Sequence, residues 1–250
     1  MSKEKLAALS SEERVLFFLL GYAANQITLF QKLLVLSTNA EPKEAEEQIL
    51  AGAQTQMLAR LAIGILNEAY EVIHKRFLGR LVGKEYIERL DAGGNAALER
   101  LKERFGKSNL LTTLRTHFAF HHPRDDVVEA GFKTAMDTPD LNDYWNWYMG
   151  NSPINFFYLA SDLVILGGMM HAAKSDTLVE AQSKIMAEVR GANDDILEFI
   201  SAFIIAVWRK NFGAELEATI CADISDAPHL MEVSIPFFVQ TDATSKEAPP

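Results

Sequence analysis

An arginine and two histidines stand close together near the middle of this 250-residue chain. Arg115 precedes His121 and His122 within Thr112–Pro123, TTLRTHFAFHHP. A guanidinium is a permanent cation that binds phosphate through parallel hydrogen bonds, and imidazole transfers protons near neutral pH. These side chains could therefore bind a phosphate and activate a nucleophile beside it. No other stretch of the sequence gathers as much chemistry.

The spacing of these residues resembles that of the HEPN superfamily, whose ribonuclease members carry arginine, several residues and then histidine on a helix of an all-α bundle. Arg115, the intervening THFAF and His121 carry the resemblance, and His122 also stands at an allowed spacing. Thr116 occupies the position where the family often has Asn or Asp. The resemblance implies a metal-independent endoribonuclease that needs no cofactor. It also implies a homodimer with a shared cleft, in a toxin, defence or antitoxin setting.

The resemblance assigns the catalytic roles to Arg115 and a histidine. His121 would take the proton from an RNA 2′-hydroxyl, and Arg115 would stabilise the phosphate as charge builds on it. At 100° per residue, His122 lies nearer the helical face of Arg115, whereas the family pattern favours His121. We expect His121 to act and keep His122 as the alternative. The expected substrate-binding residues are His117, Arg124 and Lys107.

Positive charge gathers around this segment. Residues 102–124 carry five Lys or Arg side chains and one acid, Glu103, a local net charge of +4 on a chain whose formal net charge is −10. A basic spot on an acidic protein favours a discrete anionic substrate over a long duplex. The sequence therefore predicts an RNA site that is local rather than extended.

Two sequence features could instead indicate a metal. Glu71 and His74 form half of a di-iron carboxylate pattern, but the sequence holds no second Glu-x-x-His. His117 and His121 are four residues apart and could chelate an ion, but two ligands are too few. We expect no metal site.

Composition predicts a folded cytoplasmic protein. Hydrophobic residues make up 48% of the chain, which is ample for a packed core. A single cysteine, Cys221, fits a reducing compartment, and the charged N-terminal residues do not form a signal peptide. Two apolar stretches, residues 15–31 and 154–173, contain polar side chains that favour buried helices over membrane spans.

Helical periodicity predicts an all-α bundle of six to eight helices over residues 1–213, followed by an extended C-terminal arm and a disordered tail over 214–250. Ser10 and Glu13 form a capping box before a first helix whose second apolar row predicts burial on two sides, as in the interior of a bundle or at a dimer seam. The next helix spans about 42–80, with a break near Gly64 or Gly79. The remaining helical segments are expected over 84–90, 95–105, 108–122, 125–136, 154–173, 176–190 and 194–208.

A non-catalytic function is the alternative. In that case the chain would be an all-α binding or scaffold protein whose histidines serve as helix-end or buried groups. Four aromatic residues of the irregular segment 138–152 leave the same choice open: Tyr144, Trp145, Trp147 and Tyr148. They could stack on bases, but we expect them to seal the end of the bundle or a subunit contact.

Overall fold

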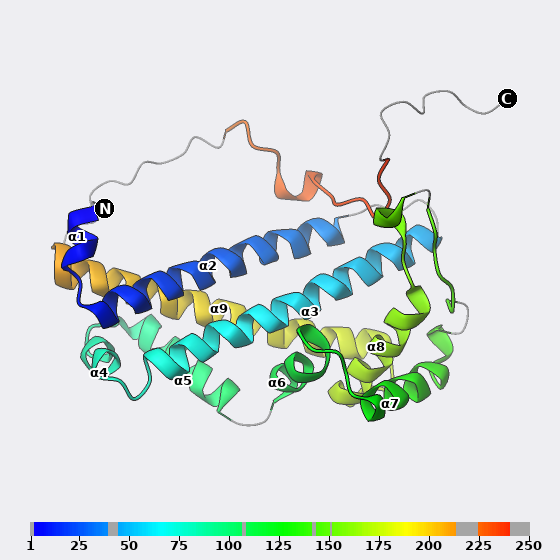
Figure 1. The fold of residues 1–250 in the computed structure, drawn as a ribbon, viewed down its shortest axis with the longest axis horizontal. Helices are drawn as coiled ribbons and strands as arrows, with labels where there is room; N and C mark the ends of the chain where they lie inside the picture. The colour runs from blue at the N-terminus through cyan, green and yellow to red at the C-terminus, as the bar shows by residue number, and fades with distance from the viewer. Residues whose placement is uncertain are drawn as a thin grey trace. The chain divides into compact units, whose positions relative to one another are not determined.

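The protein is all-α in the computed structural model, which describes residues 3–39, 45–106, 109–141, 144–150, 152–213 and 225–240. Within these ranges the chain forms no β-strand beyond an isolated bridge between Tyr148 and Phe157. The α-helices are α1 Lys3–Ala8, α2 Ser11–Thr38, α3 Ala45–Arg76, α4 Leu81–Ile87, α5 Ala92–Phe105, α6 Leu110–Leu114, α7 Asp125–Met136, α8 Leu159–Ala173 and α9 Leu178–Phe212 (Figure 1). The predicted fold class is confirmed.

The chain divides into two compact units that share the long helices α2, α3 and α9. Unit 1 comprises residues 1–31, 60–122 and 183–227, and unit 2 comprises residues 32–59, 123–182 and 228–250. The segment that holds Arg115, His121 and His122 therefore belongs to unit 1.

Stacked and edge-on aromatic rings form the core of unit 1. Phe77 lies edge-on to Phe199 and Phe203, with ring centroids 5.0 and 5.9 Å apart, and Tyr86 lies edge-on to Phe203 at 5.1 Å. All four side chains are fully buried. The apolar stripe that the sequence places along residues 196–208 thus packs α9 against the end of α3 and against α4.

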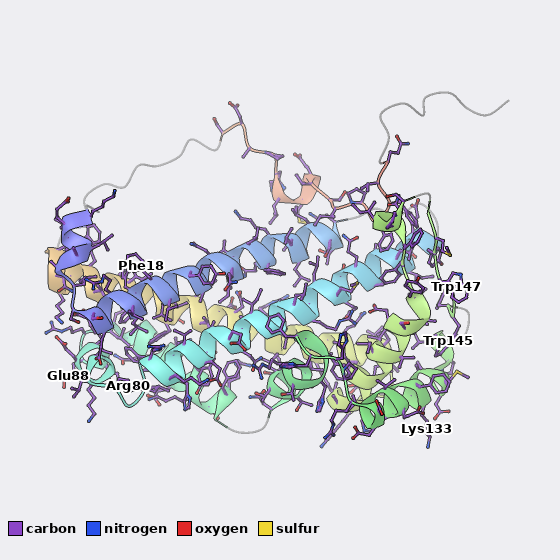
Figure 2. The ribbon with its side chains drawn as sticks, in the orientation of Figure 1. Phe18, Arg80, Glu88, Lys133, Trp145 and Trp147 are labelled. Atoms are coloured by element: carbon purple, nitrogen blue, oxygen red, sulfur yellow. The ribbon has the colours of Figure 1, made fainter. Side chains whose placement is uncertain are left out.

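Helix α2 begins with the predicted capping box. The Ser10 N–H donates to Glu13 Oε2 at 3.1 Å, and the Glu13 N–H donates to Ser10 Oγ at 3.3 Å. One apolar row is buried, but the second row is not, so the prediction that α2 is buried on two sides is wrong for a single chain. Its exposed members are Val15, Phe18, Tyr22 and Leu29, of which Figure 2 labels Phe18.

A buried polar network joins the start of α2 to α4 and α9. Glu13 Oε1 accepts hydrogen bonds from the Tyr86 hydroxyl at 2.6 Å and from Lys210 Nζ at 2.5 Å. Lys210 also pairs with Glu85 at 2.7 Å, and Asn211 Nδ2 donates to the Tyr86 hydroxyl at 3.2 Å. Burial alone would raise the pKa of Glu13, but the hydrogen bonds from Lys210, Tyr86 and Ser10 outweigh it and lower the pKa to about 2. Burial and the bond to Glu13 raise the pKa of Tyr86 to about 12.

This network predicts a defined pH dependence. Because the pKa of Glu13 is lower in the folded protein than in the unfolded chain, its carboxylate stabilises the fold at pH values above 4.5, the unfolded pKa. That stabilisation is lost as the pH falls towards 2. We expect Glu13→Gln to lower the free energy of unfolding by about 3 kcal/mol at pH 7, because Lys210 and Tyr86 lose their anionic partner. Urea unfolding of the wild type and Glu13→Gln at pH 7, 4 and 2.5 measures this difference in the free energy of unfolding.

The difference in stability between the wild type and Glu13→Gln should shrink steadily across that pH range. Glu12→Gln is the matched control, since Glu12 is exposed and makes no hydrogen bond or ion pair with any residue in the described ranges. A Glu13→Gln effect that is the same at pH 7 and pH 2.5 would contradict the network's electrostatic role.

The break predicted near Gly64 or Gly79 occurs at the second of these glycines. Helix α3 runs uninterrupted through Gly64 and ends at Arg76, and the chain turns at Gly79, where φ is +71°. Residues 176–190 and 194–208 were predicted as separate segments but belong to the single helix α9. Gly191 lies between them and lets the Arg104 guanidinium approach, since a Cβ there would lie 2.5 Å from Arg104 Nη2. Gly191 thus allows close packing and does not end the helix.

The short helices also begin earlier than predicted. Helix α4 starts at Leu81 rather than at residue 84. Helix α5 starts at Ala92 rather than at residue 95, with Asp91 as its N-cap, which accepts a hydrogen bond from the Gly94 N–H at 2.7 Å. An Asp side chain at the N-cap satisfies a free backbone donor of the first turn.

In unit 2 the helices α7 and α8 touch through glycines. A Cβ on Gly131 would lie 2.4 Å from the Val164 carbonyl oxygen, and one on Gly167 would lie 2.2 Å from the Gly131 carbonyl oxygen. Real Cβ atoms do not approach backbone this closely, so the absence of side chains at both positions sets the distance between the two helices.

The aromatic segment mostly packs against the core of unit 2. Tyr144, Trp145 and Tyr148 contact the cluster of Ala53, Ala135, Leu141, Leu159 and Leu163, while Trp147, labelled with Trp145 in Figure 2, is exposed. Three of the four aromatic residues therefore pack against a core cluster rather than standing free in solvent.

The C-terminal arm lies along residues of the same unit. Asn155 holds Val239 through a pair of hydrogen bonds of 2.8 and 3.0 Å, and the Ile235 N–H donates to the Leu36 carbonyl at 3.2 Å. An extended arm is predicted over this segment; Leu230–Glu232 instead form a short 3-10 helix, and residues 233–240 form neither helix nor strand. The predicted disordered end, residues 241–250, lies outside the described residues.

One described helix, Glu47–Arg76, is long and apolar enough to cross a membrane by length and composition. In its most apolar window 56% of the residues are buried inside the protein. A buried core helix meets the same criteria, so this feature is weak evidence for a membrane span.

Candidate functional site

The segment that carries Arg115 is a short helix that changes type at the arginine. Asn109 caps α6 by accepting a hydrogen bond from the Thr112 N–H at 2.8 Å, and the helix continues as a π-helix, η1, over Arg115–Ala119. The Thr113 and Thr116 hydroxyls donate to carbonyls four residues back, at 3.0 and 2.8 Å. Such back-bonding competes with the helical ladder, and π-helical turns occur often at functional sites.

The prediction of a regular helix over residues 108–122 is therefore wrong. His121 and His122 lie beyond the end of η1, and residue 108, where the predicted helix begins, lies outside the described residues. Because a turn of 100° per residue does not hold through a π-helix, the helical phase that favoured His122 no longer distinguishes the two histidines. Thr116, which differs from the family pattern, uses its hydroxyl within its own helix.

One face of α3 holds this segment in place. Asn67 is buried, and its Nδ2 donates to the Leu111 carbonyl at 3.4 Å as well as to Ile63 at 2.9 Å. The Phe120 ring lies over Gly64, where a Cβ would be 2.5 Å from two ring carbons. Glu68 lies on the same face and binds Arg115. Residues 64, 67 and 68 have the spacing of one helical face.

The Arg115 guanidinium is anchored along one side. Its Nη2 donates to Glu68 Oε1 at 2.6 Å, and its Nε is buried without a hydrogen-bond partner. Nη1 makes no hydrogen bond with any residue in the described ranges, and the side chain is 33% exposed. Part of the guanidinium therefore remains available to an anion from solvent.

The imidazoles differ in their surroundings. His117 is half-buried, with its ring edge-on to Phe118 at 6.0 Å. His121 and His122 are exposed, and neither makes a hydrogen bond or ring contact with another described residue. No hydrogen bond joins Arg115 to either of them. The expected catalytic side chains are thus accessible to a substrate but are not joined to one another.

The local positive charge predicted from sequence is largely neutralised by ion pairs. Four of the five cations of residues 102–124 are described, and each lies against a carboxylate: Lys102 with Glu99 at 2.6 Å, Arg104 with Glu188 at 2.5 Å, Arg115 with Glu68 at 2.6 Å and Arg124 with Asp126 at 2.9 Å. The partners of Arg104 and Arg115 are distant in sequence, so a charge count over a window could not include them. The prediction of a net positive spot is wrong for these four cations.

The structure does not describe two expected substrate-binding residues together with Arg115 in unit 1. Arg124 belongs to unit 2, where it lies at the start of α7 beside Asp126. Lys107 lies outside the described residues. Of the expected substrate-binding residues, only His117 lies in η1 with Arg115.

The alternative metal ligands form ordinary surface contacts. Glu71 pairs with Lys75 at 2.7 Å, and the His74 ring stacks on Tyr70 at 6.0 Å. Among the residues that the structure describes, no group of three His, Cys, Asp or Glu side chains is placed to hold a metal ion.

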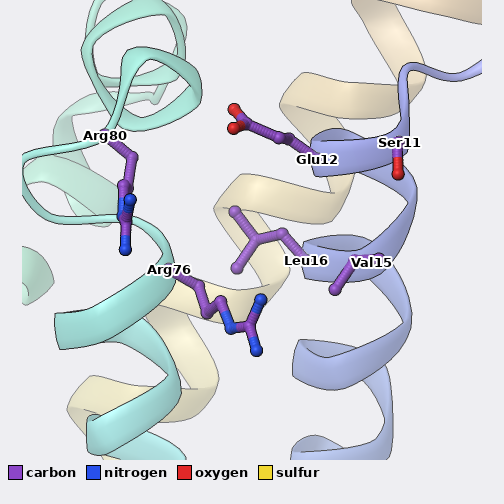
Figure 3. Close-up of a pocket in the computed structure, with 6 residues that line it drawn as sticks. All are labelled: Ser11, Glu12, Val15, Leu16, Arg76 and Arg80. Carbon is purple, nitrogen blue, oxygen red and sulfur yellow. The ribbon is translucent and has the colours of Figure 1, made fainter.

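A separate pocket of about 200 Å³ lies between the start of α2 and the end of α3. Figure 3 shows Arg76 and Arg80 on the α3 side and Glu12, Val15 and Leu16 on α2, with the Arg76 guanidinium directed towards α2. Two cations and one carboxylate line this pocket together with apolar side chains. Arg115 does not line it, so the pocket is distinct from the candidate catalytic residues.

Sequence reasoning identified Arg115 and the histidines but missed Glu68, Asn67 and Gly64. A signal was present, because Gly64, Asn67 and Glu68 interrupt an otherwise apolar stretch of α3 on one face.

Comparisons with protein-family models, with curated proteins and with solved structures return no match. The function is therefore inferred from the residues of this chain.

Proposed function

We propose that this protein is a metal-independent endoribonuclease of the HEPN-like kind, with Arg115 and His121 as its catalytic residues. The observation that carries the proposal is the partly open Arg115 guanidinium in a π-helical turn that leads directly to two solvent-exposed imidazoles. A substrate phosphate can reach both kinds of group without unfolding the core.

The chemistry proceeds by transfer within the RNA. His121 accepts the proton of a 2′-hydroxyl, whose oxygen forms a bond to the adjacent phosphorus as the bond from phosphorus to the 5′-oxygen breaks. Arg115 stabilises the negative charge that builds on the non-bridging oxygens. His122 supplies a proton to the departing 5′-oxygen. The products are a 2′,3′-cyclic phosphate and a 5′-hydroxyl, so atoms and charges balance without an added nucleophile.

Binding of the substrate must compete with Glu68. A phosphate can use the unpaired Nη1 of Arg115 while Glu68 keeps Nη2, or it can displace the carboxylate, which is half-exposed. His117, which lies in η1 with Arg115, would contact a neighbouring nucleotide. The exposed apolar row of α2 offers a surface through which a second copy could associate, as the family resemblance implies.

Cleavage of a mixed single-stranded RNA in the presence of chelator tests this proposal. We expect cleavage by the wild type and by His74→Ala, which removes an exposed histidine of α3 outside the site. His121→Ala should lose cleavage by a factor of about 100 or more, and His122→Ala should be slower than wild type. Equal cleavage by wild type and His121→Ala would reject His121, and no cleavage by wild type would reject the activity.

The ion pairs favour a second candidate, a non-catalytic all-α binding or scaffold protein. Glu68 neutralises Arg115, and the other described cations of the segment are also paired. In that case Arg115 holds α6 and η1 on α3, and Arg115→Ala would alter stability without altering any RNA reaction. The same cleavage experiment separates the two candidates.

A further inference from the structure

Unit 2 contains an apolar pocket of about 230 Å³ that the proposed ribonuclease chemistry does not use. Its walls come from the first half of α3, from α8, from the start of α9 and from Leu141 and Tyr144. Leu159, Leu163 and Leu166 form much of its buried surface, and Gly52 on α3 is exposed at its edge. Mostly apolar pockets with a few polar groups are the usual form of small-molecule sites.

Of the glutamines that line this pocket without a hydrogen-bond partner among the described residues, Gln56 is the most deeply buried. Gln56 lines the pocket, is only 8% exposed, and makes no hydrogen bond with any residue in the described ranges. Its amide atoms are not among the fully buried side-chain atoms that lack a partner, so a small molecule in the pocket can reach them. Gln56 therefore offers a donor and an acceptor that no described residue occupies.

The walls limit the chemistry of the occupant. An engineered cavity of about 150 Å³ holds one benzene molecule, so this pocket has room for a six-membered ring with a small polar substituent. The mostly apolar walls disfavour a charged ligand, because burying a charge without a partner is costly. A primary amide or a lactam matches Gln56, because it offers an acceptor and a donor side by side and can form two parallel hydrogen bonds with the glutamine amide.

We propose that this pocket binds a small, uncharged, planar molecule that carries a carboxamide or lactam edge, with Gln56 as its recognition residue. The proposal is independent of the ribonuclease assignment, since it uses no residue of the Arg115 segment.

Calorimetric titration of the full chain with benzamide tests the site, with toluene and benzoate as comparison probes. For a ligand of this size we expect a benzamide dissociation constant below about 1 mM, with weaker binding of toluene and no measurable binding of benzoate. Gln56→Leu should weaken benzamide binding by about tenfold or more and reverse the preference in favour of toluene. Gln31→Leu, an exposed glutamine of α2, is the matched control.

A second variant tests the pocket without a substitution at the buried Gln56. A Cβ on Gly52 meets no atom within 4 Å, so Gly52→Leu can place a side chain at the edge of the pocket without disturbing the helix. It should weaken both benzamide and toluene, whereas Gly21→Leu, at an equally open helical position, should weaken neither. The proposal is overturned if wild type shows no saturable benzamide binding, if benzamide and toluene bind equally, or if Gln56→Leu or Gly52→Leu binds benzamide like wild type.

Discussion

Arg115→Ala should lower the rate of RNA cleavage by a factor of about 100 to 1,000, the usual effect of removing a group that stabilises charge in the transition state. Arg115→Lys should recover only a small part of that loss, because an ammonium cannot form the two parallel hydrogen bonds of a guanidinium with phosphate. Single-turnover cleavage in chelator measures both variants against wild type.

Two further variants make the result specific. Arg89→Ala removes an exposed arginine whose partner, Glu85, is 3.8 Å away, and should leave cleavage unchanged. Glu68→Gln removes the charge that competes with phosphate, so we expect several-fold tighter RNA binding. Since Arg115 and Glu68 form a partly exposed pair, these changes should alter stability by at most about 1 kcal/mol. Unchanged cleavage by a folded Arg115→Ala variant would remove the arginine from the proposed site.

Gly167→Ala should be the most destabilising methyl addition in unit 2. The added Cβ would lie 2.2 Å from the Gly131 carbonyl oxygen and 2.9 Å from the Ala135 nitrogen, both of which are backbone atoms. Helices α7 and α8 must move apart to accept it, at a cost of about 3 kcal/mol. Urea unfolding, monitored by the fluorescence of tryptophans such as Trp145, measures the loss in the free energy of unfolding.

Other glycines provide the comparison. Gly21→Ala and Gly52→Ala add the same methyl group to helices where nothing lies within 4 Å, and should stabilise the protein by about 0.5 to 1 kcal/mol. Gly131→Ala should resemble Gly167→Ala, and the double variant should cost less than the sum, because one separation of the helices accommodates both groups. A Gly167→Ala variant as stable as Gly21→Ala would contradict the close contact of α7 and α8.

Helix type was predictable from sequence because apolar periodicity and capping residues act locally. Ser10 and Glu13 form the capping box that their spacing predicts, and residues 125–136 form α7 as expected. Helix ends were less predictable where a distant residue decides them. Gly64 and Gly191 look like breaks in sequence, yet each provides room for a side chain from elsewhere, Phe120 and Arg104.

The candidate site was only partly predictable for the same reason. Arg115 and the histidines stand close together in sequence, whereas Glu68 precedes Arg115 by 47 residues and reaches it only through packing of α6 on α3. The helix also becomes a π-helix at Arg115, where the hydroxyls of Thr113 and Thr116 bond to their own helix, and apolar periodicity does not reveal that change. A charge count along the chain could not reveal that the described cations of this segment are paired.

The chemical ends of the RNA fragments give the most direct test of the central claim, that His121 and Arg115 make a 2′-hydroxyl attack the neighbouring phosphate. With chelator present, we predict fragments that end in a 2′,3′-cyclic phosphate and begin with a 5′-hydroxyl, and no cleavage where the single 2′-hydroxyl at the target site is replaced by hydrogen. Fragments with a 3′-hydroxyl and a 5′-phosphate, or cleavage that persists without the 2′-hydroxyl, would contradict the mechanism.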